Sequence, residues 1–358
     1  EGMTMNDLWK PGWDVSRARY LDWWDRRGLV ISMWEHLEVE GISHEPASAP
    51  PPARDLEQKW FDTDWRAADI HYRLSRSELR ADIPPVANTQ LGPGSLAAVF
   101  GSELVGGEDT IWLEPVAPDA PLVFDETGPG LRRHLEIVEA CKRLSDGRYF
   151  VGMPDLMEGL DTLTTVRGVA PVMEQIILEP ERVEEDLQRI NEVWFDVFDR
   201  IYDVIQVDGE MAFCYFSLWS PGKMAKLQCD VSLMISPTHF ARFVVPFITE
   251  QCRWLDHSMY HLDGVQAIIH LDALLEIEEL DAVQWTPGVG QPQGGDPTWF
   301  EMYRKIRAAN KSVMASLVEV DELEALLDAV GPQGLHVLME FRAPSDIDRT
   351  LEIVERYR

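Results

Sequence analysis

Short apolar runs alternate with longer helical patterns along most of the chain. The apolar runs are the length of strands, and the helical patterns place apolar residues at every third or fourth position. The clearest helical stripe lies between Glu181 and Ile205, where Val183, Leu187, Ile190 and Trp194 share one face. Regular alternation of strands and helices predicts a parallel sheet with helices packed against it.

Eight runs are predicted to be strands: Leu29–Trp34, Ala81–Asn88, Arg148–Pro154, Met211–Leu218, Ser258–Leu262, Ala282–Trp285, Ser312–Leu317 and Leu335–Met339. The main predicted helices are Leu131–Leu144, Glu181–Ile205, Pro237–Trp254, Leu271–Leu280, Trp299–Ala309, Asp321–Leu327 and Ser345–Tyr357.

Eight strands in a chain of 358 residues predict an α/β fold of the (β/α)8 TIM-barrel type. We expect one barrel domain over residues 1–358, in which residues 1–28 form a Trp-rich N-terminal arm over one end. A doubly wound sheet is the alternative fold. It is less favoured because no glycine-rich dinucleotide fingerprint follows any predicted strand.

Two segments fall outside this alternation. Residues 44–54 contain four prolines and are expected to form an irregular surface loop. Residues 89–130 are long and rich in Gly and Pro, and a loop of that size in a barrel is typical of a cover over the active site.

The composition excludes several classes of function. A net charge of -30 repels nucleic acid and anionic lipid, and it disfavours a substrate with many carboxylates. No run of 18 apolar residues is present, the polar residues 1–10 predict no secretory signal, and the four cysteines are spread singly without a Cys-x-x-Cys pair. We therefore expect a cytoplasmic protein with reduced thiols, with no membrane or nucleic-acid partner.

Polar side chains follow most of the predicted strands, at the end where barrel enzymes place their chemistry. Asp155 and Glu158 follow the third strand and are expected to orient substrate or move a proton. The side chains expected to bind substrate at the strand ends are Trp34, Asn88, Gln90, Trp219, Trp285 and Arg342.

The turn His261-Leu262-Asp263-Gly264 is the sharpest local signal in the chain. Residues two apart in extended backbone lie on one face, so His261 and Asp263 can act together, and Gly264 permits a tight turn. Such a pair can bind a divalent metal or work as an acid–base pair. A hydrogen-bonded structural pair is the other interpretation.

Four motifs stand out between about Pro84 and the C-terminus: Leu91-Gly92-Pro93-Gly94, the stretch from Asp230 through Ser236-Pro237 to Phe247, Tyr260–Gly264 and Leu280–Trp285. Together they resemble the uroporphyrinogen decarboxylase-like superfamily, which includes zinc methyltransferases of corrinoid-dependent demethylation. The Trp-rich start and the His-Leu-Asp-Gly turn are similar to the subgroup named trimethylamine corrinoid protein-like.

The departures from that family bear on the chemistry. The arginine motif with which the decarboxylases grip carboxylates is absent, which argues against a porphyrinogen substrate. The resemblance implies metal ligands at His261, Asp263 and Glu340, where the two carboxylates replace the family's two cysteines. Zinc is the first expected metal, but oxygen ligands admit other divalent ions. Whether Cys229 joins the site stays open.

Three functions remain at this stage. The first is a metal-dependent methyltransferase that moves a methyl group between a small substrate and a corrinoid on a partner protein. The second is a metal-dependent lyase or hydrolase that acts on a small polar molecule without a corrinoid. The third is a non-catalytic binding protein. The resemblance also implies a homodimer.

Overall fold

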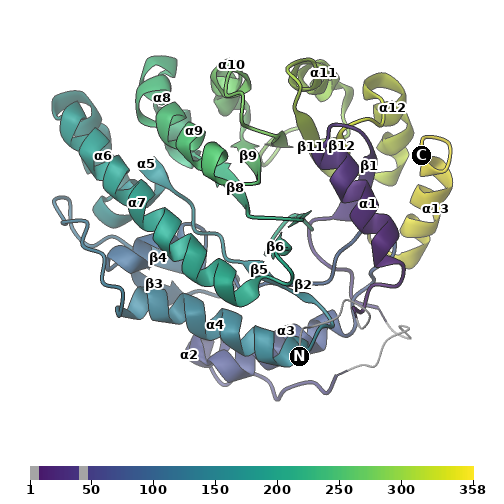
Figure 1. The fold of residues 1–358 in the computed structure, drawn as a ribbon, viewed down its shortest axis with the longest axis horizontal. Helices are drawn as coiled ribbons and strands as arrows, with labels where there is room; N and C mark the ends of the chain where they lie inside the picture. The colour runs from purple at the N-terminus through teal and green to yellow at the C-terminus, as the bar shows by residue number, and fades with distance from the viewer. Residues whose placement is uncertain (1–7, 40–46) are drawn as a thin grey trace.

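The computed structural model describes residues 8–39 and 47–358, and it is a mixed α/β structure with parallel sheets (Figure 1). Six strands form the larger sheet, in the order β1-β12-β11-β10-β9-β8, and every neighbouring pair is parallel. These strands are β1 (Leu29–Met33), β8 (Met224–Gln228), β9 (His257–Asp263), β10 (Ala282–Thr286), β11 (Ser312–Val318) and β12 (Leu335–Met339).

A second sheet has the order β2-β5-β6-β7. Its strands are β2 (Val86–Ala87), β5 (Phe150–Met153), β6 (Met211–Phe213) and β7 (Trp219–Ser220), of which β7 pairs antiparallel with β6. All eight runs predicted from the sequence therefore contain a strand. The strand β8 was not predicted, because its sequence Met-Ala-Lys-Leu-Gln carries two polar side chains.

The closed TIM barrel that the sequence predicted is not shown, because no strand pairing joins the two sheets within the described residues. One interruption lies between β1 and β2, where a carboxylate oxygen of Asp82 accepts the main-chain N–H of Ile31 at 2.9 Å. The other lies between β6 and β8, where the chain first turns back through β7. At one seam Ile31 and Asp82 are joined by that bond and by a main-chain hydrogen bond from Asp82 N to the Ile31 carbonyl at 2.7 Å, and at the other seam a reversed strand takes the place of the ladder of a closed barrel.

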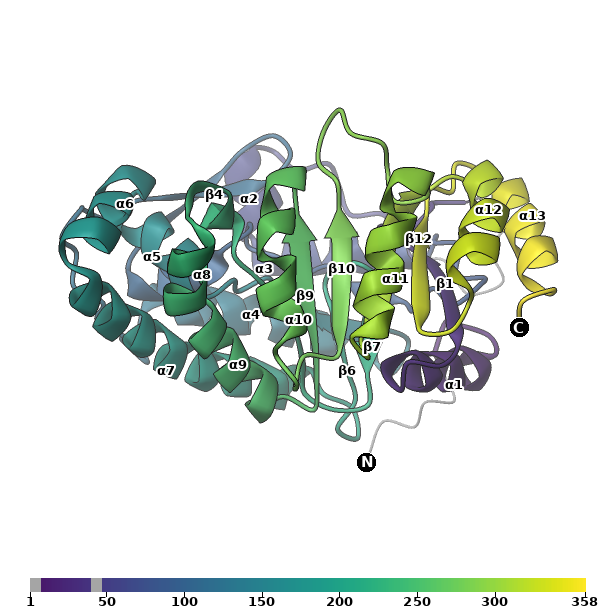
Figure 2. The same ribbon diagram turned by 90° about the horizontal axis from the view of Figure 1, so that it is seen from above.

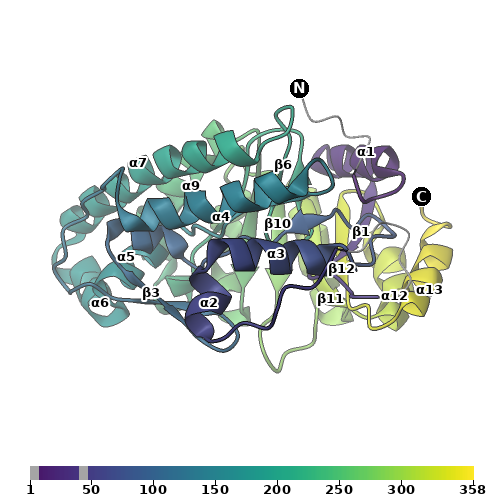
Figure 3. The same cartoon turned by 90° about the horizontal axis from the view of Figure 1, so that it is seen from below.

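Helices pack along the outer side of the strands. Figure 2 shows α10, α11 and α12 beside β9, β10 and β12, and Figure 3 shows α3 and α4 side by side on the opposite face. The helices are α1 (Trp13–Trp24), α2 (Leu56–Phe61), α3 (Thr63–Leu74), α4 (Pro129–Ser145), α5 (Gly159–Arg167), α6 (Val169–Leu178), α7 (Pro180–Ile205), α8 (Pro237–Phe243), α9 (Val245–Trp254), α10 (Leu271–Leu275), α11 (Phe300–Ala308), α12 (Val320–Val330) and α13 (Pro344–Val354).

The predicted helices are present, with three changes. The predicted helix Leu271–Leu280 is shorter in the structure, where α10 ends at Leu275. The predicted helix Pro237–Trp254 is divided into α8 and α9 at Val244, because Pro246 lacks the N–H that a continuous helix needs at that point. The predicted loop 89–130 contains a short 3-10 helix, η2 (Ser95–Phe100), and an antiparallel hairpin of β3 (Glu103–Gly106) and β4 (Ile111–Glu114).

The predicted arm is the helix α1, which closes the end where the strands begin. Tyr20, Trp23 and Trp24 are fully buried there. Trp23 Nε1 donates to the carbonyl of Val313 at the start of β11, and Trp24 Nε1 donates to the carbonyl of Trp219. Burial of these large rings stabilises the domain and leaves the opposite ends of the strands for chemistry. Residues 1–7 and 44–46 of the predicted arm and loop lie outside the described residues, and residues 47–54 form no helix or strand.

In the part of the chain that the structure describes, no helix combines the length and the apolar character needed to cross a lipid bilayer.

Candidate functional site

A cluster of acidic, basic and amide side chains lies where β5, β8, β9 and β10 end. The loop after β5 contributes Asp155, Glu158 and Asp161, and β8 contributes Lys226 and Gln228. The 3-10 helix η3 (Asp230–Met234), β9 and β10 contribute Asp230, His261, Asp263 and Gln284. The carboxyl ends of parallel strands meet at this edge, so residues far apart in the chain come together.

Asp230, His261 and Asp263 can each direct one ligand atom to a common point. These three atoms lie within 4.8 Å of one another, which is the spacing that a bound metal ion requires. His261 and Asp263 therefore face the same space, as their spacing along β9 predicted, with Nε2 of His261 at 4.0 Å from a carboxylate oxygen of Asp263. The third side chain of the group, Asp230, was not predicted as a ligand.

The orientation of His261 is held from behind by Gln284. The side-chain nitrogen of Gln284 donates to Thr286 Oγ1 at 2.8 Å and to Ser316 Oγ, so its oxygen faces Nδ1 of His261. An amide oxygen only accepts, and Nδ1 therefore carries the proton. Burial and the nearby Lys226 lower the pKa of His261 to about 3, so the ring is neutral and its Nε2 lone pair is free.

Lys226 is the buried cation at the centre of the cluster. Its ammonium lies 2.8 Å and 3.0 Å from the two carboxylate oxygens of Asp155, and it also contacts Gln228 Oε1. An isolated charge at such a buried position would be costly, and the ion pair offsets that cost.

Glu158 and Asp161 hold the main chain of residues 228–231 in place. Glu158 accepts the main-chain N–H of Gln228 at 2.6 Å, and Asp161 accepts the main-chain N–H groups of Asp230 and Val231 at 2.8 Å and 3.0 Å. Asp161 thereby positions Asp230 beside His261 and Asp263, and these three residues are the candidate metal-binding group. Burial raises the pKa of Glu158 well above its usual range, and Lys226 and the N–H of Gln228 act in the opposite sense.

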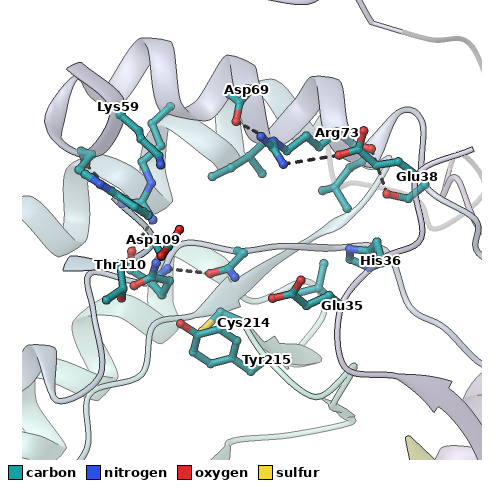
Figure 4. A pocket seen from close by; sticks show the side chains of 18 of the residues that line it. Glu35, His36, Glu38, Lys59, Asp69, Arg73, Asp109, Thr110, Cys214 and Tyr215 are labelled. Atoms are coloured by element: carbon teal, nitrogen blue, oxygen red, sulfur yellow. Dashed lines mark hydrogen bonds and ion pairs between the residues drawn. The ribbon is translucent and has the colours of Figure 1, made fainter. Parts of the chain in front are cut away.

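A cavity of about 660 Å³ lies beside this cluster, between α3, β2 and the turn after β6 (Figure 4). Trp34, Asn88 and Gln90, three of the residues predicted to bind substrate, line it. Figure 4 shows Glu35 and Tyr215 inside it, with Asp69 and Arg73 along the far wall.

The ring of Phe216 stands between the cavity and the metal-binding group. Its centroid lies 4.3 Å from that of Trp34 and 5.4 Å from that of His261. Phe216 and Ser217 both have positive φ values, 64° and 47°, which are strained for residues with side chains. Strain of this kind persists where the surroundings hold it in place, and it is concentrated at functional sites.

The structure does not bring the other predicted site residues to the cavity. Trp219 is fully buried at the opposite end, near Trp13 and Tyr20, because β7 runs back toward the strand starts. Trp285 is fully buried against Trp299, with the ring centroids 5.0 Å apart. These positions follow from the reversal at β7 and from the outward face of β10.

Arg342 and Glu340 follow β12, away from His261. Arg342 is exposed and pairs with Glu319. Glu340 is not in the metal-binding group, and β10 and β11 separate β12 from β9, which is about 14 Å along the sheet. Cys229 is buried but is also outside that group, and burial raises the pKa of its thiol well above the usual value.

Lys226, Asp230 and Gln284 are the site residues that sequence reasoning missed. Asp230 opens a motif that the sequence did mark, but it was not predicted as a ligand. Lys226 and Gln284 are polar residues inside otherwise apolar runs, and such a residue signals a polar interior position in a strand.

No protein-family model and no curated protein matches this chain. Among solved structures, a methyltransferase from Methanosarcina mazei matches with a TM-score of 0.57 and 12% sequence identity, over 94% of this chain and 98% of that one. At this level of identity the match concerns architecture. The chain therefore shares the fold of this methyltransferase over nearly its whole length.

Proposed function

We propose that the protein is a metal-dependent methyltransferase whose divalent cation is held by Asp230, His261 and Asp263. The convergence of these three side chains carries the proposal. The shared fold with a methyltransferase supports the proposal. We also propose that this fold is an opened barrel of the uroporphyrinogen decarboxylase type. Zinc is the first metal to test, because one imidazole and two carboxylates suit it.

The residues present fit a metal ion. His261 offers an unprotonated Nε2, and its Nδ1–H is held by Gln284, as the second shell of a metal-bound histidine requires. A cation there would act as a Lewis acid on a substrate heteroatom. Asp161 keeps Asp230 in place, and Glu340 has no part in this arrangement.

The remaining residues of the cluster would handle the proton. A methyl group that moves without its bonding electrons leaves the electron pair on the substrate heteroatom, which then takes up a proton. Glu158, whose pKa is raised by burial, is the proposed donor, while Asp155, paired with Lys226, is the proposed acceptor for a substrate hydrogen bond.

The rim of the site favours a corrinoid on a partner protein as the second reactant. Leu233, Met234, Ile269 and Val289 are exposed apolar side chains on the loops that follow β8, β9 and β10. Isolated apolar residues on a surface are common, but a group at the mouth of a site suits a large apolar ligand. A homodimer remains part of this proposal.

A second candidate is a metal-dependent lyase or hydrolase without a corrinoid. The cavity favours it, because charged residues such as Glu35, Asp69 and Asp109 line the space. Both functions need the metal, but only the methyltransferase needs a corrinoid as its second reactant.

The first test is the metal content of the wild type, of His261→Ala and of the control His239→Ala, which changes a histidine on α8. We expect about one divalent ion per chain in the wild type and the control, and a loss in His261→Ala. Absence of metal from all three, after supplementation with zinc, manganese and iron, would contradict both metal functions. If metal binds, the absorbance of methylcobalamin in the presence of small thiols and amines distinguishes the methyltransferase from the lyase or hydrolase. Demethylation supports the transferase, and an unchanged spectrum supports the second candidate.

A further inference from the structure

Arg66 is a buried cation that forms no ion pair with an acidic side chain of residues 8–39 and 47–358. It lies on α3, is 6% exposed and lines the cavity. Its guanidinium donates to the main-chain carbonyl of Gln90 and, at 3.5 Å, to that of Trp60. Among the described residues it forms no ion pair, although buried cations in proteins are normally paired.

Arg73 and Lys59 also line the cavity wall, and both are less buried than Arg66. Arg73 is mostly exposed and binds Asp69 at 2.9 Å and Glu38 at 3.5 Å. Lys59 is less buried than Arg66 and donates to the main-chain oxygen of Glu108. Arg66 is therefore the cation of this wall that combines deep burial with the lack of a counter-charge. Burial lowers the pKa of Arg66 to about 10, which is the expected effect of a missing anion.

Two further donor groups line the same cavity. The hydroxyl of Tyr215 makes no hydrogen bond within residues 8–39 and 47–358, and Figure 4 shows its ring in the cavity. Burial raises the pKa of this hydroxyl and the charge of Arg66 acts in the opposite sense, and both residues line the cavity. Asn88 uses its side-chain oxygen to accept the N–H of Gln90 at 3.2 Å, which leaves its amide hydrogens for another acceptor.

We propose that the cavity binds a small monocarboxylate whose carboxylate group pairs with Arg66. The planar guanidinium matches a carboxylate in a two-point contact, and Tyr215 and Asn88 supply further hydrogen bonds. Trp34 and Trp60 provide aromatic surface for the body of the ligand. The carboxylates of Glu35, Asp69 and Asp109 line the same space and would repel a second negative charge.

This site goes beyond the metal-binding group and does not depend on it. The residues that line the cavity include none of the three proposed metal ligands, and the ring of Phe216 packs against both Trp34 of the cavity and His261. Binding of a carboxylate can therefore be measured in the metal-free protein, and failure of one proposal leaves the other standing.

The test is calorimetric titration of the full chain with benzoate, and with benzyl alcohol, benzylamine and benzenesulfonate as matched probes. We expect benzoate to bind, benzyl alcohol to bind at least about tenfold more weakly, and benzylamine not to bind. Arg66→Gln should weaken benzoate binding about tenfold or more, and Tyr215→Phe a few-fold. The control Arg73→Gln, on the same wall, should change it less than about twofold, because Arg73 already has its own partners.

Three outcomes would overturn the carboxylate site. They are unchanged benzoate affinity in Arg66→Gln, equal affinity for benzyl alcohol, and no binding of benzoate, acetate or butyrate at millimolar concentration. Tighter binding of benzenesulfonate than of benzoate would show that the site prefers another anionic group, and it would also contradict the proposal. If Arg66→Gln fails to fold, Arg66→Lys and Tyr215→Phe decide, since unchanged affinity in both would contradict it.

Discussion

Asp155 and Lys226 form an ion pair of 2.8 Å in which the two side chains are 9% and 1% exposed. Burial alone lowers the pKa of Lys226, but Asp155 and the other carboxylates around it reverse that effect and raise it. The pair is thus the electrostatic centre of the acidic cluster, and the two residues come from β8 and from the loop after β5.

Lys226→Met is expected to destabilise the protein strongly. The methionine fills much of the volume, but Asp155 then stays buried without a partner, which costs about 3–5 kcal/mol. Urea unfolding followed by circular dichroism measures the loss. The double variant Lys226→Met/Asp155→Leu removes both charges and should recover a large part of it. An equal loss in the single and double variants would show that the charge of Asp155 is not the cause.

Gln284→Leu is expected to weaken metal binding without removing a ligand. The leucine cannot accept the Nδ1 proton of His261, so the ring is free to rotate or to change its tautomer. Loss of such a second-shell partner lowers metal affinity about 10- to 100-fold. Competition with a zinc-binding dye measures the affinity, and Gln266→Ala, an exposed amide near the site, is the control. Equal affinity in Gln284→Leu and the control would remove Gln284 from the site.

Asp82→Asn is expected to weaken the seam between β1 and β2. The buried Asp82 carboxylate accepts from Ile31 N at 2.9 Å and from Arg19 at 2.7 Å, and it also contacts Arg358. Asparagine keeps the shape but leaves two partly buried arginines without their anion, at a cost of about 3 kcal/mol. Chemical unfolding should show this loss, whereas Asp25→Asn, in an exposed pair with Arg27, should show little. Similar small losses in both would mean that the seam does not depend on this charge.

His134 is expected to make the protein less stable in acid. Its Nδ1 donates to the Gly130 carbonyl at 2.8 Å, and burial lowers the pKa of the ring from 6.5 to about 4. A lowered pKa means that the stabilisation is complete above pH 6.5 and is lost as the pH falls through 4, by about 3 kcal/mol in total. Urea unfolding from pH 7 to pH 4 should show a shallower decline for His134→Gln than for the wild type. Parallel declines would contradict this role.

The sequence predicted the strands and helices well because the apolar positions alternate clearly. All eight predicted runs contain strands, and α7 begins one residue before the predicted helix and ends where that helix ends. The interruption of the barrel could not be read in the same way. It involves a two-residue reversed strand at Trp219–Ser220 and the contacts between Asp82 and Ile31, and neither leaves a periodic pattern.

The candidate site was predicted in part, for a similar reason. His261 and Asp263 share one strand, so their spacing alone placed them on one face. The third side chain of the group comes from a distant part of the sequence, so spacing gave no guide to it. The resemblance indicated Glu340, whereas the structure places Asp230 beside His261 and Asp263. Trp219 and Trp285 look like binding residues in a sequence, but a buried tryptophan in the core has the same local pattern.

The aromatic helix α1 bears on the direction from which a ligand approaches. Because Tyr20, Trp23 and Trp24 are buried at the end where the strands begin, we expect a ligand of the cluster to arrive and depart at the end where the strands finish. In the proposed methyl transfer both reactants would use that end, and the second to arrive would cover the first. Turnover of the proposed reaction should therefore follow a compulsory order, in which the smaller molecule binds first and leaves last.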